Sequence, residues 1–154
     1  MFDAPVDAWY VWLGLALVSV AVFGVGLSLA TPPPPSADRL ANAVDSVAAS
    51  PYGAVRTIAV DADYVSLTPW EVGLRSDGGA AHARVTYGPI TPARTGSLEA
   101  ILRGRAPSTL FESSERFRAA LARARNRSGE WLVVPDQLTA RRISWGGIDA
   151  TLVG

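Results

Sequence analysis

The feature that most constrains this chain is a long stretch near its start that carries no charge. The 30 residues from 8 to 37 include no acidic or basic side chain, and the 23 residues from Ala8 to Ala30 are almost all apolar. As a helix, such a stretch would extend about 34 Å, which matches a bilayer hydrocarbon core of about 30 Å. We therefore expect one transmembrane helix here.

Aromatic residues and prolines mark the two ends of this stretch. Trp9, Tyr10 and Trp12 stand at its start, and rings with an apolar body and a polar edge favour the headgroup region of a bilayer. The four prolines at 32–35 follow its end, where they cannot continue a helix. The predicted organisation is a tail at 1–8, a transmembrane helix at 9–30, a proline-rich spacer at 31–36 and a head domain at 37–154.

Cleavage and orientation leave alternatives open for this segment. Ser28 and Ala30 are small residues that a signal peptidase accepts, but the n-region at 1–7 has no positive charge, so we favour an uncut anchor. The positive-inside rule finds only Arg39 nearby, which favours a cytoplasmic head, whereas the candidate N-glycosylation sequon at Asn126 makes sense only outside. We expect a single-pass protein of the cell membrane with an extracytoplasmic head.

The head domain alternates between helix-like and strand-like periods. Amphipathic helices are predicted to begin at Ser36 and at Ser113 or Ser114, and a shorter one covers 97–103. Strict alternation from Trp70 to Tyr87 around a glycine-containing turn predicts a hairpin. Further strands are predicted at 55–60, 64–67, 131–134, 138–145 and 148–153. The fold class is α+β, an antiparallel sheet with two or three helices packed on one face.

Composition excludes several classes of chemistry. The chain has no cysteine, and His82 is its single histidine, so thiolate and multi-histidine metal sites are impossible. A net charge of zero argues against nucleic acid as a partner. The head contains no phosphate-binding loop and no nucleophile elbow. We therefore expect no catalytic residue, no metal, no cofactor and no enzymatic activity.

One concentration of charge stands out in the head. Residues 101–127 hold seven arginines against two glutamates, a local net charge of +5. Such a cluster is typical of a solvated helix face, because arginines late in a helix offset the negative end of its dipole. The functional alternative is electrostatic docking on anionic lipid headgroups or on an acidic partner subunit. The candidate docking residues are Arg116, Arg118, Arg123, Arg125 and Arg127.

Three strings of the sequence carry a resemblance to a known family. They are the opening MFDAPVDAWYVWLGLALVSVAVFGVGLSLATPPPP, the central VGLRSDGGAAHARVTYGPITP and the closing RRISWGGIDATLVG. Together they resemble a haloarchaeal family of single-pass membrane proteins of unknown function, across essentially the whole chain. The resemblance implies association with type IV pilus-like or secretion-type assembly components. It defines no catalytic residue, and residues 1–7 do not resemble the basic leader of a major pilin.

These observations predict a non-catalytic function. We expect a non-enzymatic, membrane-anchored structural or accessory subunit, minor pilin-like, that contacts membrane lipid and other membrane or pilus-like subunits. The alternative is a membrane-tethered binding module whose α+β head recognises a ligand or surface polymer. A concave pocket would favour the binding module, and a flat head with an exposed apolar strip would favour assembly.

Overall fold

The chain divides into two units, residues 1–32 and residues 33–154, of which the computed structural model describes residues 7–28 and 33–154. The first unit contains helix α1 (Asp7–Ser28), which overlaps the helix predicted at 9–30 from the apolar run. Judged over the described residues, no helix of the protein is both long and apolar enough to cross a membrane. The membrane-spanning part of that prediction therefore gains no support here. Residues 1–6 of the predicted tail and 29–32, where helix and spacer were predicted to meet, lie outside the described residues.

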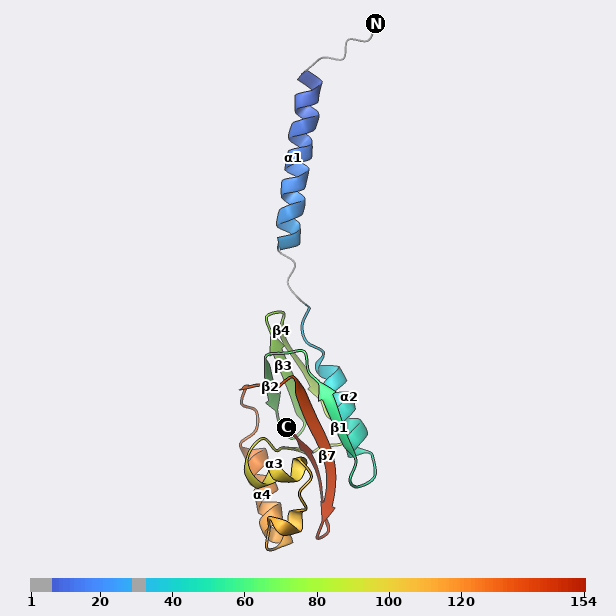
Figure 1. Ribbon diagram of the computed structural model, residues 1–154, viewed down its shortest axis with the longest axis vertical. Coiled ribbons are helices and arrows are strands. Elements are labelled where there is room, and N and C mark those ends of the chain that lie inside the picture. The colour runs from blue at the N-terminus through green and yellow to red at the C-terminus, as the bar shows by residue number, and fades with distance from the viewer. Residues whose placement is uncertain (1–6, 29–32) are drawn as a thin grey trace. The chain divides into compact units, whose positions relative to one another are not determined.

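The second unit is built from two sheets and three α-helices, and all of its residues are described (Figure 1). The first sheet has the strand order β1-β7-β8-β5 and the second has the order β4-β3-β2-β6. The helices are α2 (Ala37–Ala48), α3 (Gly96–Leu102) and α4 (Ser114–Asn126), with a short 3-10 helix at Pro107–Thr109. The strands are β1 (Val55–Ala59), β2 (Tyr64–Leu67), β3 (Glu71–Ser76), β4 (Gly79–Arg84), β5 (Ile90–Pro92), β6 (Leu132–Val133), β7 (Gln137–Trp145) and β8 (Ile148–Val153).

The presence of two sheets corrects the prediction of a single one. Each pair of neighbouring strands is antiparallel except β5 and β8, which run parallel. The pairing joins distant segments, since Val55 of β1 lies opposite Arg141 of β7. An alternating pattern identifies a strand and its buried face, but it does not specify which strand lies beside it. The α+β class is confirmed.

The first core lies between α2 and the inner faces of both sheets. Leu40, Val44 and Val47 form the predicted apolar stripe of α2 and are fully or almost fully buried. Their neighbours in this core include Val65 and Val72 of the second sheet. The core is completed by residues of the first sheet, among them Ile58, Ile90, Leu138, Ala140 and Val153.

Polar contacts hold the two ends of α2. The side chain of Ser36 makes no capping bond, contrary to expectation, and the amide of Ala37 donates to the carbonyl of Pro35 instead. At the other end, Nη1 of Arg142 donates to the carbonyl of Ala48. A guanidinium at this position offsets the negative end of the helix dipole. Arg142 thereby links β7 to the end of α2.

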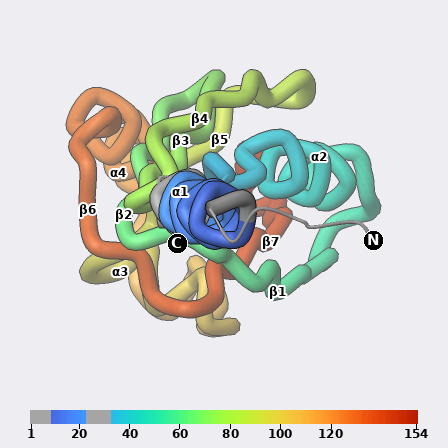
Figure 2. The backbone as a smooth tube through the Cα atoms, turned by 90° about the horizontal axis from the view of Figure 1, so that it is seen from above, coloured from blue at the N-terminus to red at the C-terminus, as the bar shows by residue number. Residues whose placement is uncertain are grey.

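The second core lies on the opposite face of the first sheet, under α3 and α4. Phe117 of α4 is completely buried there, with its ring centroid 5.4 Å from that of Phe111 and 5.7 Å from that of Trp145. Helices therefore cover both faces of the first sheet, and α2 and α4 lie on opposite sides of the head (Figures 1 and 2). The prediction of helices on one face was wrong. The other members of this core include Leu98, Ile101, Leu121, Ile143, Ala150 and Leu152.

Both predicted hairpins are present, with one change of detail. Trp145 pairs with Ile148 at the end of the β7–β8 hairpin, and the turn residues Gly146 and Gly147 have φ values of 57° and 74°. Two positive φ angles are what a tight two-residue hairpin turn requires, and glycine adopts them without steric cost. In the β3–β4 hairpin, by contrast, Trp70 falls outside the ladder and is 53% exposed, although its alternation predicts an inward ring.

Removing the ring of Phe117 should destabilise the head strongly. We expect Phe117→Ala to lower the free energy of unfolding by about 3–5 kcal/mol, because the ring leaves a cavity in a closed core. Arg118→Ala, at the exposed neighbouring position of the same helix, should stay within about 0.5 kcal/mol of wild type. Denaturant unfolding of the full chain in neutral detergent, followed by tryptophan fluorescence, measures both. Equal midpoints for the two variants would contradict the assignment of this core.

Candidate functional site

The predicted membrane-interface residues all lie on the first turns of α1. The exposed fractions are 74% for Trp9, 73% for Tyr10 and 70% for Trp12. The described side chains that follow them, from Val11 to Val22, are exposed as well. The aromatic residues thus begin a helix whose described side chains contact solvent on every side.

Arg125 differs from the other predicted docking arginines because its guanidinium turns towards the sheet. Its Nε donates to Oγ1 of Thr91 at 2.8 Å, and its Nη2 donates to the carbonyl of Pro89 at 3.4 Å. Burial lowers the pKa of this guanidinium, which nevertheless keeps its proton at neutral pH. Arg125 therefore fastens α4 to β5, and we separate it from the docking set.

The remaining arginines of α4 occupy two different faces. Arg116 and Arg123 are seven residues apart, which places them along one flank of the helix, and Arg127 follows four residues after Arg123 as the residue that caps the end of α4. Arg118 lies outside this row. Arg116 pairs with the carboxylate of Glu112 at 3.2 Å, an exposed pair one helical turn apart. The structure therefore concentrates the predicted patch into a row.

The row borders a groove that the sequence did not predict. We call it the arginine groove, a cavity of about 480 Å³ between α4 and the segment that follows β5. Its charged lining residues are arginines, with no acidic residue among them. Apolar side chains line it as well. The residues that define it are Arg94, Arg123, Arg127, Leu98, Phe111 and Leu132.

Arg94 is the functional candidate that sequence reasoning missed. Its Nη2 donates to the carbonyl of Val133 at 2.6 Å, while its Nη1 is buried without a hydrogen-bond partner in the described part of the chain. Arg94 stands outside residues 101–127, where arginines are concentrated, and it belongs to no helix or strand. The one available signal was an isolated arginine just after Pro92.

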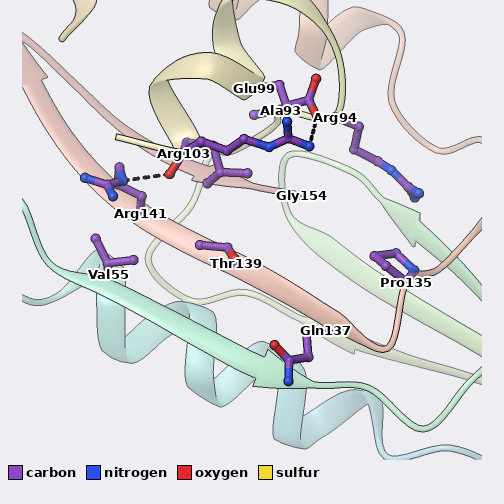
Figure 3. A pocket seen from close by; sticks show the side chains of 11 residues that line it. Val55, Ala93, Arg94, Glu99, Arg103, Pro135, Gln137, Thr139, Arg141 and Gly154 are labelled. Carbon is purple, nitrogen blue, oxygen red and sulfur yellow. Dashed lines mark hydrogen bonds and ion pairs between the residues drawn. The ribbon is translucent and has the colours of Figure 1, made fainter. Parts of the chain in front are cut away.

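A second cavity, which we call the sheet cavity, lies on the first sheet beside α3. It encloses about 460 Å³ and is lined by residues that include Thr139 and Arg141 of β7. Nη2 of Arg103 lies 2.6 Å from Oε1 of Glu99, and Nε of Arg141 donates to the carbonyl of Leu102 at 2.8 Å (Figure 3). Arg94 also lines this cavity, but its side chain extends away from the Glu99–Arg103 pair (Figure 3). The other charged groups here already have partners.

The single histidine lies on the outer face of the second sheet, as its register predicts. Nδ1 of His82 is 3.0 Å from Oε1 of Glu71, and its ring meets Trp131 edge to face at 5.6 Å. Arg75 stacks nearby, 4.6 Å from the centroid of Tyr64 and 4.9 Å from that of Trp131. These exposed groups satisfy one another. Among the described residues, no cluster of acidic or histidine side chains could hold a metal ion.

The predicted glycosylation site lies at the end of α4. Asn126 is the last residue of that helix and is exposed. The hydroxyl of Ser128, the third residue of the sequon, donates to the carbonyl of Arg125 at 2.5 Å. The exposure of Asn126 leaves its amide accessible, and its use as a glycosylation site stays a prediction.

These features define an α+β head with an arginine-lined groove, in a chain that also carries an N-terminal helix. The sequence model of DUF7283, a family of unknown function, matches residues 3–143. The chain belongs to this family. Comparison with curated proteins gives no match, and comparison with solved structures gives none either.

The difference in role between Arg125 and the groove arginines can be measured through the stability of the protein. We expect Arg125→Gln to lower the free energy of unfolding by about 1–2 kcal/mol, because Thr91 and Pro89 lose a charged donor in a partly buried place. Arg123→Gln removes the same charge from the same helix and should change it by less than about 0.5 kcal/mol. Denaturant midpoints of the two variants decide the matter. Equal losses of stability would show that Arg125 carries no special packing role.

Proposed function

We propose that the protein is a membrane-anchored, non-enzymatic accessory subunit of a pilus-like or secretion-type assembly at the surface of a haloarchaeal cell. In this proposal α1 is the core of the anchor and residues 33–154 form an extracytoplasmic head. The head contacts other subunits of the assembly. The proposal gives each of the two units a separate environment.

The exposed apolar surface of α1 is the observation that carries the proposal. Leu13, Leu17 and Val20 are 60%, 64% and 71% exposed, and no flank of the described helix is polar. A helix that is apolar on all sides is stable only when lipid or protein covers it. The described side chains end at Val22. In the sequence, the apolar run continues from there to Ala30. The full run supplies the roughly 20 residues that a bilayer requires.

The construction of the head supports an anchored rather than a catalytic role. The residues of its two cores all lie within 37–153, so the head has its own apolar interior apart from α1. Among its described residues, no cluster of acidic or histidine side chains could hold a metal ion. The pilus-like and haloarchaeal parts of the proposal rest on the resemblance of the sequence.

The alternative function is a tethered binding module, and one observation favours it. The arginine groove and the sheet cavity enclose about 480 and 460 Å³, which lies within the range of small-ligand sites. A module of this kind would use the same anchor and the same head. It differs in its partner, which would be a small ligand or a surface polymer rather than another subunit.

The anchor is tested by where the protein is found in fractionated cells. We expect the full chain in the membrane fraction, resistant to high salt and released by detergent. Leu17→Asp should shift much of it to the soluble or degraded fraction, because a carboxylate at the centre of a membrane helix costs about 3 kcal/mol. Leu17→Ala is the matched control and should stay in the membrane. Wild-type protein that is soluble without detergent would overturn the anchor.

The assembly role predicts specific co-purification. We expect a C-terminally tagged chain, solubilised mildly at high salt, to bring down other membrane proteins in constant proportion. A version carrying the same head on an unrelated transmembrane helix serves as control, because it shows which contacts belong to α1. Recovery of the protein alone at all salt concentrations would contradict the assembly role and leave the binding module as the better proposal.

A further inference from the structure

The arginine groove holds positive charge that the described part of the protein does not compensate. The ion pairs among the described residues involve Arg103, Arg116 and His82, and none involves an arginine that lines the groove. Like charges that line one cavity repel each other, and the nearby Glu130, in a smaller adjoining cavity, forms no ion pair with them within the described residues. An anion in the groove would remove that repulsion.

Arg94 gives an independent indication of a missing acceptor. Its Nη1 has no hydrogen-bond partner in the described residues although the atom is buried. A buried donor of this kind is rare in folded proteins and lowers stability unless a partner is supplied. The carbonyl of Val133 accepts from Nη2 and fixes the guanidinium in place. An anion in the groove would be attracted by the charge of a guanidinium that is already fixed in place.

The spacing of the arginines indicates the shape of that anion. Arg123 lies in the last turn of α4 and Arg127 caps the end of the helix four residues later, a separation of about 6 Å along the helix axis. Alternate residues of an extended peptide point to the same side and lie about 6.6 Å apart. A neighbouring cavity of about 430 Å³, lined by Arg116 and Arg123, extends the row. The whole row from Arg116 to Arg127 covers about 16 Å, the length of about five extended residues.

The surface of the groove favours a peptide over a lipid bilayer. Leu98, Phe111 and Leu132 line it beside the arginines, so a bound chain would contact apolar and cationic groups together. A bilayer presents a broad plane of headgroups, whereas this site is a concavity beside α4. Arginine also forms paired hydrogen bonds with carboxylates, which gives such a contact its orientation.

We propose that the arginine groove binds an extended acidic peptide segment, with carboxylates at alternate positions, carried by a partner protein. The proposal rests on the proposed function only for the source of the segment, which would be another subunit of the assembly. Arg123 and Arg127 hold successive carboxylates, and Arg94 adds its positive charge beside them. Arg116 extends the contact when Glu112 releases it.

A blocked synthetic peptide tests this directly. The probe is a five-residue peptide of alternating Glu and Val with a fluorescent label. The control is the same peptide with Gln in place of Glu. Anisotropy is measured against the full chain in neutral detergent. We expect saturable binding of the Glu peptide at low salt, clear weakening as NaCl rises to about 0.5 M because salt screens exposed charges, and no binding of the Gln peptide.

Matched charge variants locate the binding site. The double variant Arg123→Gln/Arg127→Gln should raise the Kd of the Glu peptide at least about tenfold, since two charge-assisted contacts are lost. Arg105→Gln/Arg118→Gln removes the same net charge from exposed positions outside the groove and should leave the Kd within about twofold. The charge reversal Arg123→Glu/Arg127→Glu should instead bind the matching Lys peptide. Thermal unfolding of each variant confirms that the head remains folded.

Three results would overturn the proposal. They are equal binding of the Glu and Gln peptides, equal weakening by the two double variants, and binding restricted to micelles that contain phosphatidylglycerol, which would make the groove a lipid site. The peptide titration does not depend on where the chain resides in a cell. A soluble protein that still binds the peptide would refute the anchor alone, and an anchored protein that ignores it would refute this inference alone.

Discussion

The β7–β8 hairpin is the element on which the rest of the head depends, because both of its faces are buried. Leu138 and Val153 point into the core under α2, whereas Ile143 and Leu152 point into the core under α4. The two cores therefore share one pair of strands. A shift of register by one residue would exchange the side chains between the cores, since alternate residues of a strand face opposite sides.

Arginine supplies every basic side chain of this protein, and the head uses it mainly as a link between segments. Arg125 joins α4 to β5, Arg142 joins β7 to α2, and Arg141 joins β7 to the end of α3. The planar guanidinium suits this use, because it donates several hydrogen bonds in fixed directions while its stem packs on apolar groups. Arg94 of the groove follows the same pattern, because it joins the segment after β5 to Val133 of β6.

Much of the local structure could be predicted from the sequence because helix stripes and hairpin turns are encoded by nearby residues. The bounds of β2 and β8 agree with the alternation, and Ser113 caps α4 through the amide of Arg116 at 3.3 Å. The division into two sheets could not be predicted, because pairing between distant strands leaves no local pattern. The prediction that Trp70 points inward was wrong because the strand that follows it begins one residue later, at Glu71.

The candidate site was predicted only in part. The concentration of arginines on α4 was visible in the sequence, but the inward turn of Arg125 depends on β5, which is distant along the chain. The only signal for Arg94 was an isolated arginine after Pro92, because its importance comes from the position of α4 and β6 around it. The membrane segment stays a prediction from composition and length.

The bond between Arg94 and Val133 has a further consequence for the edge of the second sheet. Strand β6 has only two residues and is an edge strand of the second sheet, so no further strand in the described part of the chain pairs with its outer side. An exposed sheet edge can pair with a strand of a neighbouring molecule, and such pairing is a common first step of aggregation. Here a guanidinium occupies one of the few carbonyls available. The side chain of Arg94 thus blocks part of this edge against pairing with a further strand.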